Sequence, residues 1–440
     1  MSLTSVVCKV FEGFIRDKMY DHMINNNILS KNQYGFCKGR SCITQLLSTI
    51  HDWFQYLDRG IPVDAIYLDF RKAFDTVPHK RLLSKLWGYG VRDQVLKWVE
   101  DFLSDRYQYV SVNDKTSQKI PVTSGVPQGS VLGPVLFIYF INDLPDVIQC
   151  VSRIFADDTK AYDKAIDDAD FECIQNSIDS MVKWGDKWLS FFNTEKCKSL
   201  HLGKSNTNHV YTMTVNDVST PLGITECEKD LGVYVDSNLN FNEHISTIMK
   251  KAKNMCYMII RTISFKSPDI MLPLYKALVR PSLEYGNPVW CPFKKKDIDD
   301  LEDIQRFFTK CIIACSHLSY EDRLRKLKLP SLSYRRLRGD MIEVFKITHK
   351  IYDPESTKSL FDFAVGSTRN NGFKIVKKHT NTTAYQHFFT NRVVNYWNGL
   401  PRHVVNVDSV NSFKNALDCH YSHIMFDKRV DHDVVQSLRA

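Results

Sequence analysis

A buried strand that ends in a carboxylate is the feature that most constrains how this chain can fold. Residues 63–70, VDAIYLDF, are almost wholly apolar, which is typical of a strand covered on both faces, and Asp69 stands near their end. Two further short strands are predicted within residues 151–163, and Asp157 and Asp158 lie between them. If all these strands share one sheet, their carboxylates lie at the same end of it.

The remaining pattern indicates an α+β protein. Helices and strands alternate up to about residue 235, where Pro78 suits the first turn of one predicted helix. After residue 235 the apolar residues follow the helical period, and a softer boundary is predicted near Pro330. We therefore expect a mixed first part and a helical second part.

Composition excludes several classes of protein. The chain has 440 residues, of which 43% are hydrophobic and 25% charged, so a disordered or low-complexity chain is excluded. Its 12 cysteines include no C-x-x-C pair, which favours buried thiols in a reducing compartment over zinc sites or disulfides. The start resembles no signal peptide, and no apolar run is long enough to cross a bilayer. We expect an intracellular protein of the nucleus or cytoplasm, not secreted and without a membrane partner.

The net charge of +8 is unevenly distributed. Residues 301–440 contain 22 Lys and Arg against 14 Asp and Glu, whereas residues 1–300 are balanced. This excess favours a polyanion partner, and a solvated basic face is the alternative. Two basic clusters stand out: Arg323, Arg325, Lys326 and Lys328 in the first, and Arg335, Arg336 and Arg338 in the second.

Carboxylates at the end of one sheet have a specific chemical use. Carboxylate oxygens bind hard cations such as Mg²⁺, and two such ions about 3.5–4 Å apart stabilise both oxygens of an in-line phosphoryl displacement. An Asp pair at a turn is also common for purely structural reasons. The spacing of Asp69, Asp157 and Asp158 therefore permits nucleotidyl transfer without requiring it.

A glycine-containing loop lies between these carboxylates. Residues 124–130, SGVPQGS, precede an apolar helix predicted over 130–144. Glycines let the backbone approach a ligand closely, and the start of a helix favours anions. An ordinary loop with Ser130 as the helix cap is the alternative.

Four motifs carry a resemblance to a known family. They are YLDFRKAFDTVPH at 67–79, SGVPQGSVLGPVLFIYFINDLP at 124–145, FADD at 155–158 and RVVNYWNGLP at 392–401. In this order they resemble the reverse transcriptases of non-LTR retrotransposons, in particular the jockey-type LINE elements. The resemblance runs from about Ser2 to the end of the chain.

The resemblance implies a right-hand polymerase with fingers, palm and thumb. It places partial fingers at 1–60, a palm with a ferredoxin-like antiparallel sheet at 61–235, a helical thumb at 236–330 and a basic, helical C-terminal region at 331–440. The family's upstream endonuclease and first fingers motifs are expected to be absent, as in an N-terminally truncated reading frame.

The resemblance also implies roles for individual residues. Asp69, Asp157, Asp158 and the backbone of Phe70 would bind two Mg²⁺ ions, or Mn²⁺, and the three aspartates would be catalytic. The implied nucleotide-binding residues are Phe74, Gln128, Gly129, Lys38, Arg40 and Lys196. Phe74 would exclude a ribose 2′-OH, and Lys196 would donate a proton to pyrophosphate, although a plain surface lysine is the alternative.

Template and primer contacts are implied in the second half of the chain. The family's primer-contacting hairpin falls at Leu231 and Gly232. The basic residues expected to contact nucleic acid are Arg323, Arg325, Arg335, Arg336 and Arg338. The implied partners are an RNA template, a DNA primer or target, and dNTPs, and the oligomeric state is open.

One departure from the family keeps other functions open. Cys37 stands where the family usually has an arginine, and Lys38 or Arg40 would have to replace that charge. Three hypotheses remain at this stage: an RNA-directed DNA polymerase, a relic that only binds nucleic acid, and an RNA-templated RNA polymerase. The bulk of Phe74 speaks against the last.

Overall fold

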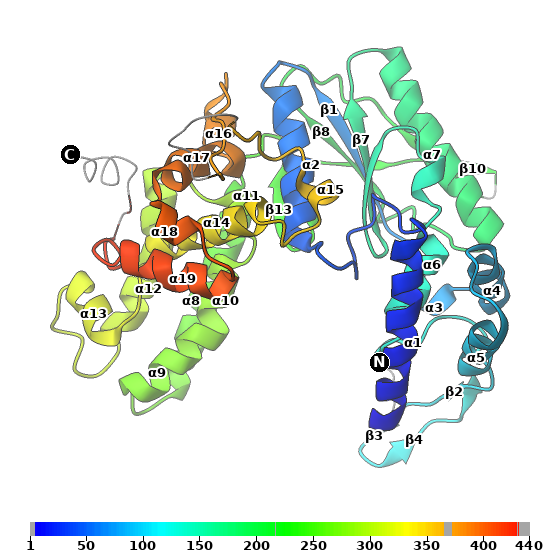
Figure 1. Ribbon diagram of the computed structural model, residues 1–440, viewed down its shortest axis with the longest axis horizontal. Coiled ribbons are helices and arrows are strands. Elements are labelled where there is room, and N and C mark those ends of the chain that lie inside the picture. Colours follow the sequence, from blue (N-terminus) through cyan, green and yellow to red (C-terminus); the bar gives the residue numbers. More distant parts are fainter. Residues whose placement is uncertain (1–4, 216, 365–371, 429, 431–440) are drawn as a thin grey trace. The chain divides into compact units, whose positions relative to one another are not determined.

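A computed structural model of the protein describes residues 5–215, 217–364, 372–428 and Val430 (Figure 1). The chain forms two compact units, of which the first contains residues 1–45 and 60–226 and the second contains residues 46–59 and 227–440. The first unit holds a large sheet and its helices, and the second is mainly helical. The predicted α+β character is therefore confirmed.

The sheet of the first unit has five strands in the order β11-β8-β1-β7-β6. Their bounds are Val63–Leu68 for β1, Val151–Phe155 for β6, Asp158–Lys164 for β7, Lys198–Leu202 for β8 and Gly223–Thr225 for β11. In the centre, β1 runs antiparallel to β7 and β8, and Ile66 lies opposite Ala161 and Ser199.

The sheet is mixed, so the predicted purely antiparallel arrangement was wrong for one strand. β11 pairs with β8 in parallel, with Gly223 opposite Lys198. A separate hairpin, β9 (Thr212–Val215) and β10 (Val218–Pro221), intervenes between β8 and β11, so the chain returns to the edge of β8 in the direction of β8.

Two helical connections each join strands that run in the same direction. Between β1 and β6 lie α3 (Ala73–Thr76), α4 (His79–Gly88), α5 (Asp93–Leu103), the short strands β2 (Tyr107–Gln108), β3 (Ser111–Val112), β4 (Lys115–Thr116) and β5 (Ile120–Pro121), α6 (Gly133–Ile141) and the 3₁₀ turn η1 (Pro145–Val147). Between β7 and β8 lies α7 (Asp168–Trp188). Ile66 of β1, Leu136 of α6 and Ile178 of α7 are fully buried and share one core.

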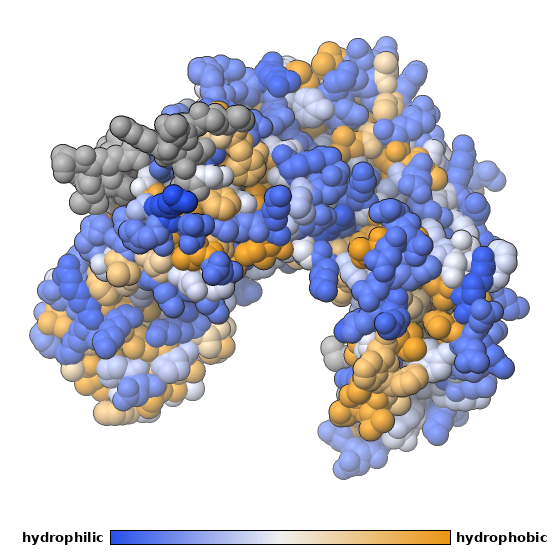
Figure 2. Space-filling model, viewed as in Figure 1, coloured by the Kyte–Doolittle hydropathy of each residue, from blue (hydrophilic) through white to orange (hydrophobic). Residues whose placement is uncertain are grey.

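The first helix, α1 (Val6–Asn25), packs on α6. The buried carboxylate of Glu12 accepts hydrogen bonds from the backbone N–H groups of Val131 and Leu132, just before α6 begins. A carboxylate at this end of a helix is stabilised by the helix dipole. Figure 2 shows apolar side chains at the N-terminal end of α1, where Val6, Val7, Val10, Phe11 and Phe14 are exposed.

The second unit is built around a central helix, α14 (Leu332–Thr348), which packs against four others. These four are α11 (Asn287–Trp290), α12 (Lys295–Lys310), α17 (Phe389–Gly399) and α19 (Val410–His420). The other elements are α8 (Asn242–Thr262), α9 (Pro268–Leu274), the π-helical η2 (Tyr275–Val279), α10 (Arg280–Glu284), α13 (Tyr320–Leu327), α15 (Pro354–Thr357), α16 (Thr383–Gln386), α18 (Arg402–Val405) and the hairpin β12 (Cys227–Asp230) and β13 (Val233–Asp236).

Most of α2 (Cys42–Leu57) belongs to the second unit, although its sequence neighbours belong to the first. Phe54 of α2 stacks on Tyr385 at a centroid distance of 5.4 Å and lies 4.9 Å from the ring of Phe388. These contacts join residues far apart in the chain, so local patterns did not reveal them. Within the described ranges, none of the helices combines the length and apolar character needed to cross a membrane.

Candidate active site

Two of the three predicted carboxylates lie just beyond the ends of paired strands of the sheet. Asp69 directly follows β1, and Asp157 lies in the two-residue connection between β6 and β7. The last paired residues of β1 and β7 are Leu68 and Thr159, so both aspartates leave the sheet at the same end. Burial raises the pKa of Asp157, and the negative charge of Asp69 also raises it. The two carboxylates are therefore close enough to interact.

Asp158 differs from Asp157 in its surroundings. It is the first residue of β7 and is exposed, whereas Asp157 is half-buried. Successive residues of an extended chain point in opposite directions. Among the residues that the structure describes, no group of three or more His, Cys, Asp or Glu side chains is arranged to hold a metal ion. The structure thus brings Asp69 and Asp157 together without a third ligand of these types.

The pair nevertheless fits a divalent cation. The Oδ2 atom of Asp69 is buried and receives no hydrogen bond. Burial and the negative charge of Asp69 both disfavour the ionised form of Asp157, as its raised pKa shows. A hard cation with oxygen ligands would neutralise the pair more fully than the single ammonium group of Lys196, which lies 3.3 Å from Asp69 Oδ2. Asp69 and Asp157 are the side chains of this site that could hold it.

The backbone around Asp69 is fixed by a short bridge. Phe70 lies opposite Phe192, and the two hydrogen bonds of this bridge run from Asn193 N–H to the Asp69 carbonyl and from Arg71 N–H to the Phe191 carbonyl. These bonds do not use the Phe70 carbonyl, and its role as a metal ligand stays a prediction.

The same bridge brings Lys196 to the site. The ammonium group of Lys196 forms an ion pair with Oδ2 of Asp69, with a separation of 3.3 Å. Its side chain is two-thirds exposed, so it reaches the carboxylate from the solvent side. The lysine predicted from the resemblance therefore lies next to a predicted catalytic carboxylate.

Phe74 lies between two other aromatic rings. It belongs to α3, and its ring stacks on Phe137 of α6 at a centroid distance of 4.1 Å. The ring of Phe36 meets it edge-on at 6.3 Å. Stacking on one side holds the Phe74 ring in place, and the side chain remains half-buried.

The glycine-containing loop is attached to the segment that follows Asp69. Gly125 has φ +92°, and a Cβ atom there would lie 2.7 Å from the Asp75 carbonyl oxygen, so only glycine fits. Gln128 Nε2 donates a hydrogen bond to Asp75 Oδ1 at 2.9 Å, and both Gln128 and Gly129 are exposed. No local pattern pointed to Asp75, whose carboxylate accepts this hydrogen bond from the predicted nucleotide-binding glutamine. Ser130 Oγ accepts a hydrogen bond from Gly133 N–H, but Leu132 is the cap residue of α6, so the prediction of Ser130 as the helix cap was wrong.

The segment with the unusual cysteine is folded on itself. Cys37 is buried, and its thiol donates to the Gly35 carbonyl at 3.2 Å. Arg40 donates to the carbonyls of Ser30, Lys31 and Gln33, so its guanidinium holds this segment together. Lys38 is exposed. Contact of Lys38 or Arg40 with a nucleotide stays a prediction.

Residues 1–258 match the family described as "Reverse transcriptase (RNA-dependent DNA polymerase)". The chain belongs to the reverse transcriptase family. The predicted family resemblance and enzyme class are thus confirmed, and the two aspartates above lie within the matched region.

Several relatives of this chain are polymerases of Drosophila retrotransposons. The chain is 27% identical to the probable RNA-directed DNA polymerase from transposon X-element of Drosophila melanogaster over 346 residues, which cover 76% of this chain and 37% of that protein. It is 26% identical to the RNA-directed DNA polymerase from mobile element jockey of the same species over 345 residues, which cover 75% and 37%. The chain thus spans little more than a third of the length of these relatives.

A solved structure of telomerase from Candida albicans, in complex with a fragment of telomeric RNA, is a more remote match. It is 11% identical, with a TM-score of 0.32, and the match covers 82% of this chain and 59% of the telomerase chain.

In the second unit of the reverse transcriptase, the hairpin predicted to contact primer is a tight turn. Leu231 and Gly232 connect β12 to β13, and both have positive φ values, 44° and 88°. The hydroxyl of Tyr285 donates to the Leu231 carbonyl at 2.8 Å. Gly232 is exposed at the tip of this turn.

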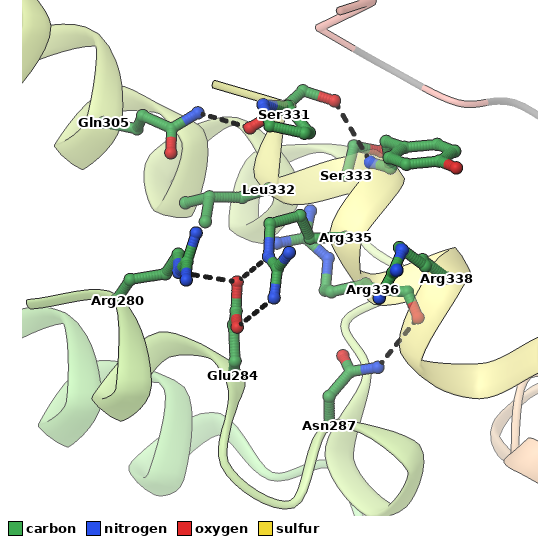
Figure 3. A network of polar contacts seen from close by, with 12 residues as sticks. Arg280, Glu284, Asn287, Gln305, Ser331, Leu332, Ser333, Arg335, Arg336 and Arg338 are labelled. Carbon is green, nitrogen blue, oxygen red and sulfur yellow. Dashed lines mark hydrogen bonds and ion pairs between the residues drawn. The ribbon is translucent and has the colours of Figure 1, made fainter. Parts of the chain in front are cut away.

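The second basic cluster forms ion pairs within the fold, and its expected contact with nucleic acid stays a prediction (Figure 3). The guanidinium of Arg335 forms a bidentate ion pair with Glu284 of α10. Arg338 forms another with Asp418 of α19, with distances of 2.6 and 2.9 Å. Arg336 is 5% exposed, close to the buried Glu302. Local spacing did not predict these acidic partners because they lie on other helices.

The first basic cluster is divided between the interior and the surface. Arg323 is 5% exposed and donates to Thr309 Oγ1 and to the carbonyls of Leu318 and Arg306. Arg325 is exposed, with an ion pair to Asp322 at 3.3 Å. Of the five arginines expected to contact nucleic acid, Arg325 is therefore the most accessible, and its binding role stays a prediction.

Proposed function

We propose that this protein is an RNA-directed DNA polymerase that transfers a nucleotide from a dNTP to a primer 3′-OH on an RNA template. The observation that carries this proposal is the Asp69–Asp157 pair at one end of the paired strands β1 and β7. The pair occurs in a chain that belongs to the reverse transcriptase family. Family membership and a pair of neighbouring carboxylates suited to divalent cations therefore support the same reaction.

The strand order supports a polymerase palm. The order β8-β1-β7-β6, with helices after β1 and after β7, is that of a ferredoxin-like unit. We assign residues 61–235 to the palm, 1–60 to partial fingers, 236–330 to the thumb and 331–440 to the basic C-terminal region. In this assignment the fold is a right-hand polymerase.

The metal requirement follows from the same pair. Asp69 and Asp157 would hold Mg²⁺ or Mn²⁺, and Asp158 and the Phe70 carbonyl are the further ligands that we propose. Divalent ions bound there would supply charge stabilisation for the phosphoryl displacement. The residues themselves present oxygen ligands at the end of the sheet and keep one carboxylate oxygen without a hydrogen bond.

Nucleotide binding is assigned to the segments around Phe74. The ring of Phe74, supported by Phe137, would lie against the sugar of the incoming nucleotide and leave no room for a 2′-OH. The loop with Gln128 and Gly129 would line the same pocket, and Lys196 would hold a proton for the departing pyrophosphate.

A second candidate function is nucleic-acid binding without catalysis. Cys37 favours it, since a buried thiol occupies the position where the family usually has an arginine. Such a protein would bind a primer–template but would not extend it.

Extension of a DNA primer on an RNA template distinguishes these functions. With Mg²⁺ and dNTPs, we expect stepwise extension that a chelator abolishes. Binding of the primer–template without extension would instead identify the non-catalytic binder. Preferential incorporation of ribonucleotides would identify an RNA polymerase.

A further inference from the structure

The turn that carries Asp157 contains a backbone conformation that needs support. Ala156, directly before Asp157, has φ +56°, in the left-handed region that residues with a Cβ atom disfavour. The turn between β6 and β7 consists of these two residues. The contacts that hold Ala156 in this conformation therefore also fix the position of the Asp157 backbone.

The side chain of Gln33 holds both backbone groups of Ala156. Its Oε1 accepts a hydrogen bond from the Ala156 N–H at 2.9 Å, and its Nε2 donates to the Ala156 carbonyl at 3.5 Å. The same Oε1 accepts from the Gly35 N–H at 2.7 Å. Gln33 is 1% exposed, so water does not compete for these bonds.

The segment around Gln33 is itself attached to β6. Gln33 lies opposite Ile154 in a parallel bridge, in which Tyr34 N–H donates to the Ile154 carbonyl and Ile154 N–H donates to the Asn32 carbonyl. At Gly35, a Cβ atom would lie 2.3 Å from the Ala156 nitrogen, so only glycine allows this approach. The parallel bridge and the close approach at Gly35 therefore both hold this segment next to the turn.

We propose that Gln33 is a positioning residue for Asp157. Its amide fixes the conformation of Ala156 and thereby the direction from which the Asp157 carboxylate meets a metal ion. This inference rests on the proposed function, in which Asp157 binds the metal. Misplacing a ligand by a small distance weakens a site strongly, so supports of this kind have large effects.

Gln33→Met tests the proposal, with Gln175→Met as its matched control. Methionine keeps the length of the side chain but removes all three hydrogen bonds of Gln33. Gln175 likewise uses its amide to hold one backbone residue of the first unit, since its Oε1 accepts from Thr212 N–H at 3.0 Å and its Nε2 donates to the Thr212 carbonyl at 2.9 Å. Thr212 belongs to the separate β9–β10 hairpin.

Two measurements are made on the full chain. The first is amide hydrogen exchange of peptides that cover residues 151–158, without metal or nucleic acid. The second is the Mg²⁺ concentration for half-maximal primer extension at saturating dNTP. For Gln33→Met we expect exchange at 151–158 to be about tenfold faster, the Mg²⁺ requirement to rise about tenfold, and the primer–template Kd to stay unchanged. For Gln175→Met we expect neither change.

The outcomes separate this inference from the proposed function. If Gln33→Met matches the wild type, or changes no more than Gln175→Met, the positioning role is overturned. If the wild type extends no primer, the proposed function fails, and Mn²⁺ binding to the free protein, followed by electron paramagnetic resonance, replaces the Mg²⁺ measurement. If Gln33→Met does not fold, Gln33→Asn, which is polar but too short to reach Ala156, is measured with the same expectations.

Discussion

The ammonium group of Lys196 lies 3.3 Å from Oδ2 of Asp69, although all the elements from α3 to α7 lie between the two residues along the chain. The bridge between Phe70 and Phe192 brings them together. Lys196 thus has two possible uses at this site, to hold the carboxylate by charge or to transfer a proton.

Replacing Lys196 distinguishes these uses. We expect Lys196→Ala to lower the maximal rate of nucleotide addition about 100-fold, because general acid catalysis contributes about 10²–10⁴-fold, and to leave the primer–template Kd unchanged. Lys196→Arg keeps the positive charge but is a poor proton donor, so it should be nearly as slow. Single-nucleotide addition under rapid quench measures both rates. A fast Lys196→Arg enzyme would show that only the charge matters.

Phe74 is expected to select deoxyribonucleotides. Overpacking an enclosed site costs about 1–3 kcal/mol, which corresponds to about 5- to 150-fold discrimination against a 2′-OH. Phe74→Val should lose most of this selectivity by admitting ribonucleotides, with little effect on dNTP addition. The ratio of kcat/KM for dTTP and UTP measures it, and Phe102→Leu, in the stack with Trp98, is the control. An unchanged ratio in Phe74→Val would rule out the sugar-selecting role.

The arginines of the C-terminal region are expected to fall into two groups. Arg335→Gln and Arg338→Gln should each lower the free energy of unfolding by about 1–3 kcal/mol, because each removes the bidentate partner of a partly buried carboxylate. Neither should change the salt dependence of nucleic-acid binding.

Arg325→Gln should leave the free energy of unfolding unchanged. It should reduce the slope of the logarithm of the binding constant against the logarithm of the salt concentration by about 0.9, as expected for one lost phosphate contact. Urea unfolding and binding at several salt concentrations measure the two effects. The reverse pattern would instead support nucleic-acid contacts at Arg335 and Arg338.

Acid should destabilise the second unit through two buried histidines. Burial lowers the pKa of His51 to about 4, with a smaller contribution from the charge of Lys378, and burial alone lowers the pKa of His244 to about 4. Because the unfolded chain takes up these protons near pH 6.5, stability is fully present above pH 6.5 and falls as the pH drops through 4. Each histidine accounts for about 3 kcal/mol of this loss.

Unfolding by urea at several pH values measures this effect. His51→Gln should reduce the slope of the free energy of unfolding against pH between 6.5 and 4, and His379→Gln, at an exposed position, should leave it unchanged. Equal slopes in His51→Gln and the wild type would contradict the assignment.

Much of the fold and part of the site follow from local patterns. Residues 63–70 are apolar enough to identify a buried strand, and the two strands predicted within residues 151–163 are β6 and β7, with the turn at Ala156 and Asp157 instead of at Asp157 and Asp158. Neither the hydrogen bond of Gln128 to Asp75 nor the hold of Gln33 on Ala156 could be predicted, because each joins segments that only the folded sheet brings together. The ion pairs of the arginines could not be predicted for the same reason. The partner of Arg335, Glu284, lies on another helix and is not indicated by the local spacing of the basic residues.

The most direct test of the central claim is the addition of a single dNTP to a DNA primer on an RNA template by the wild type and by Asp157→Asn. Asp163→Asn is the matched control, because burial also raises the pKa of Asp163, which lies on the adjoining strand β7 at the far end of its pairing with β1. We expect Mg²⁺-dependent addition by the wild type and by Asp163→Asn, and a rate at least 1,000-fold lower (~4 kcal/mol in activation free energy) in Asp157→Asn. Equal rates in Asp157→Asn and the wild type would contradict the assignment of this carboxylate pair as the catalytic centre.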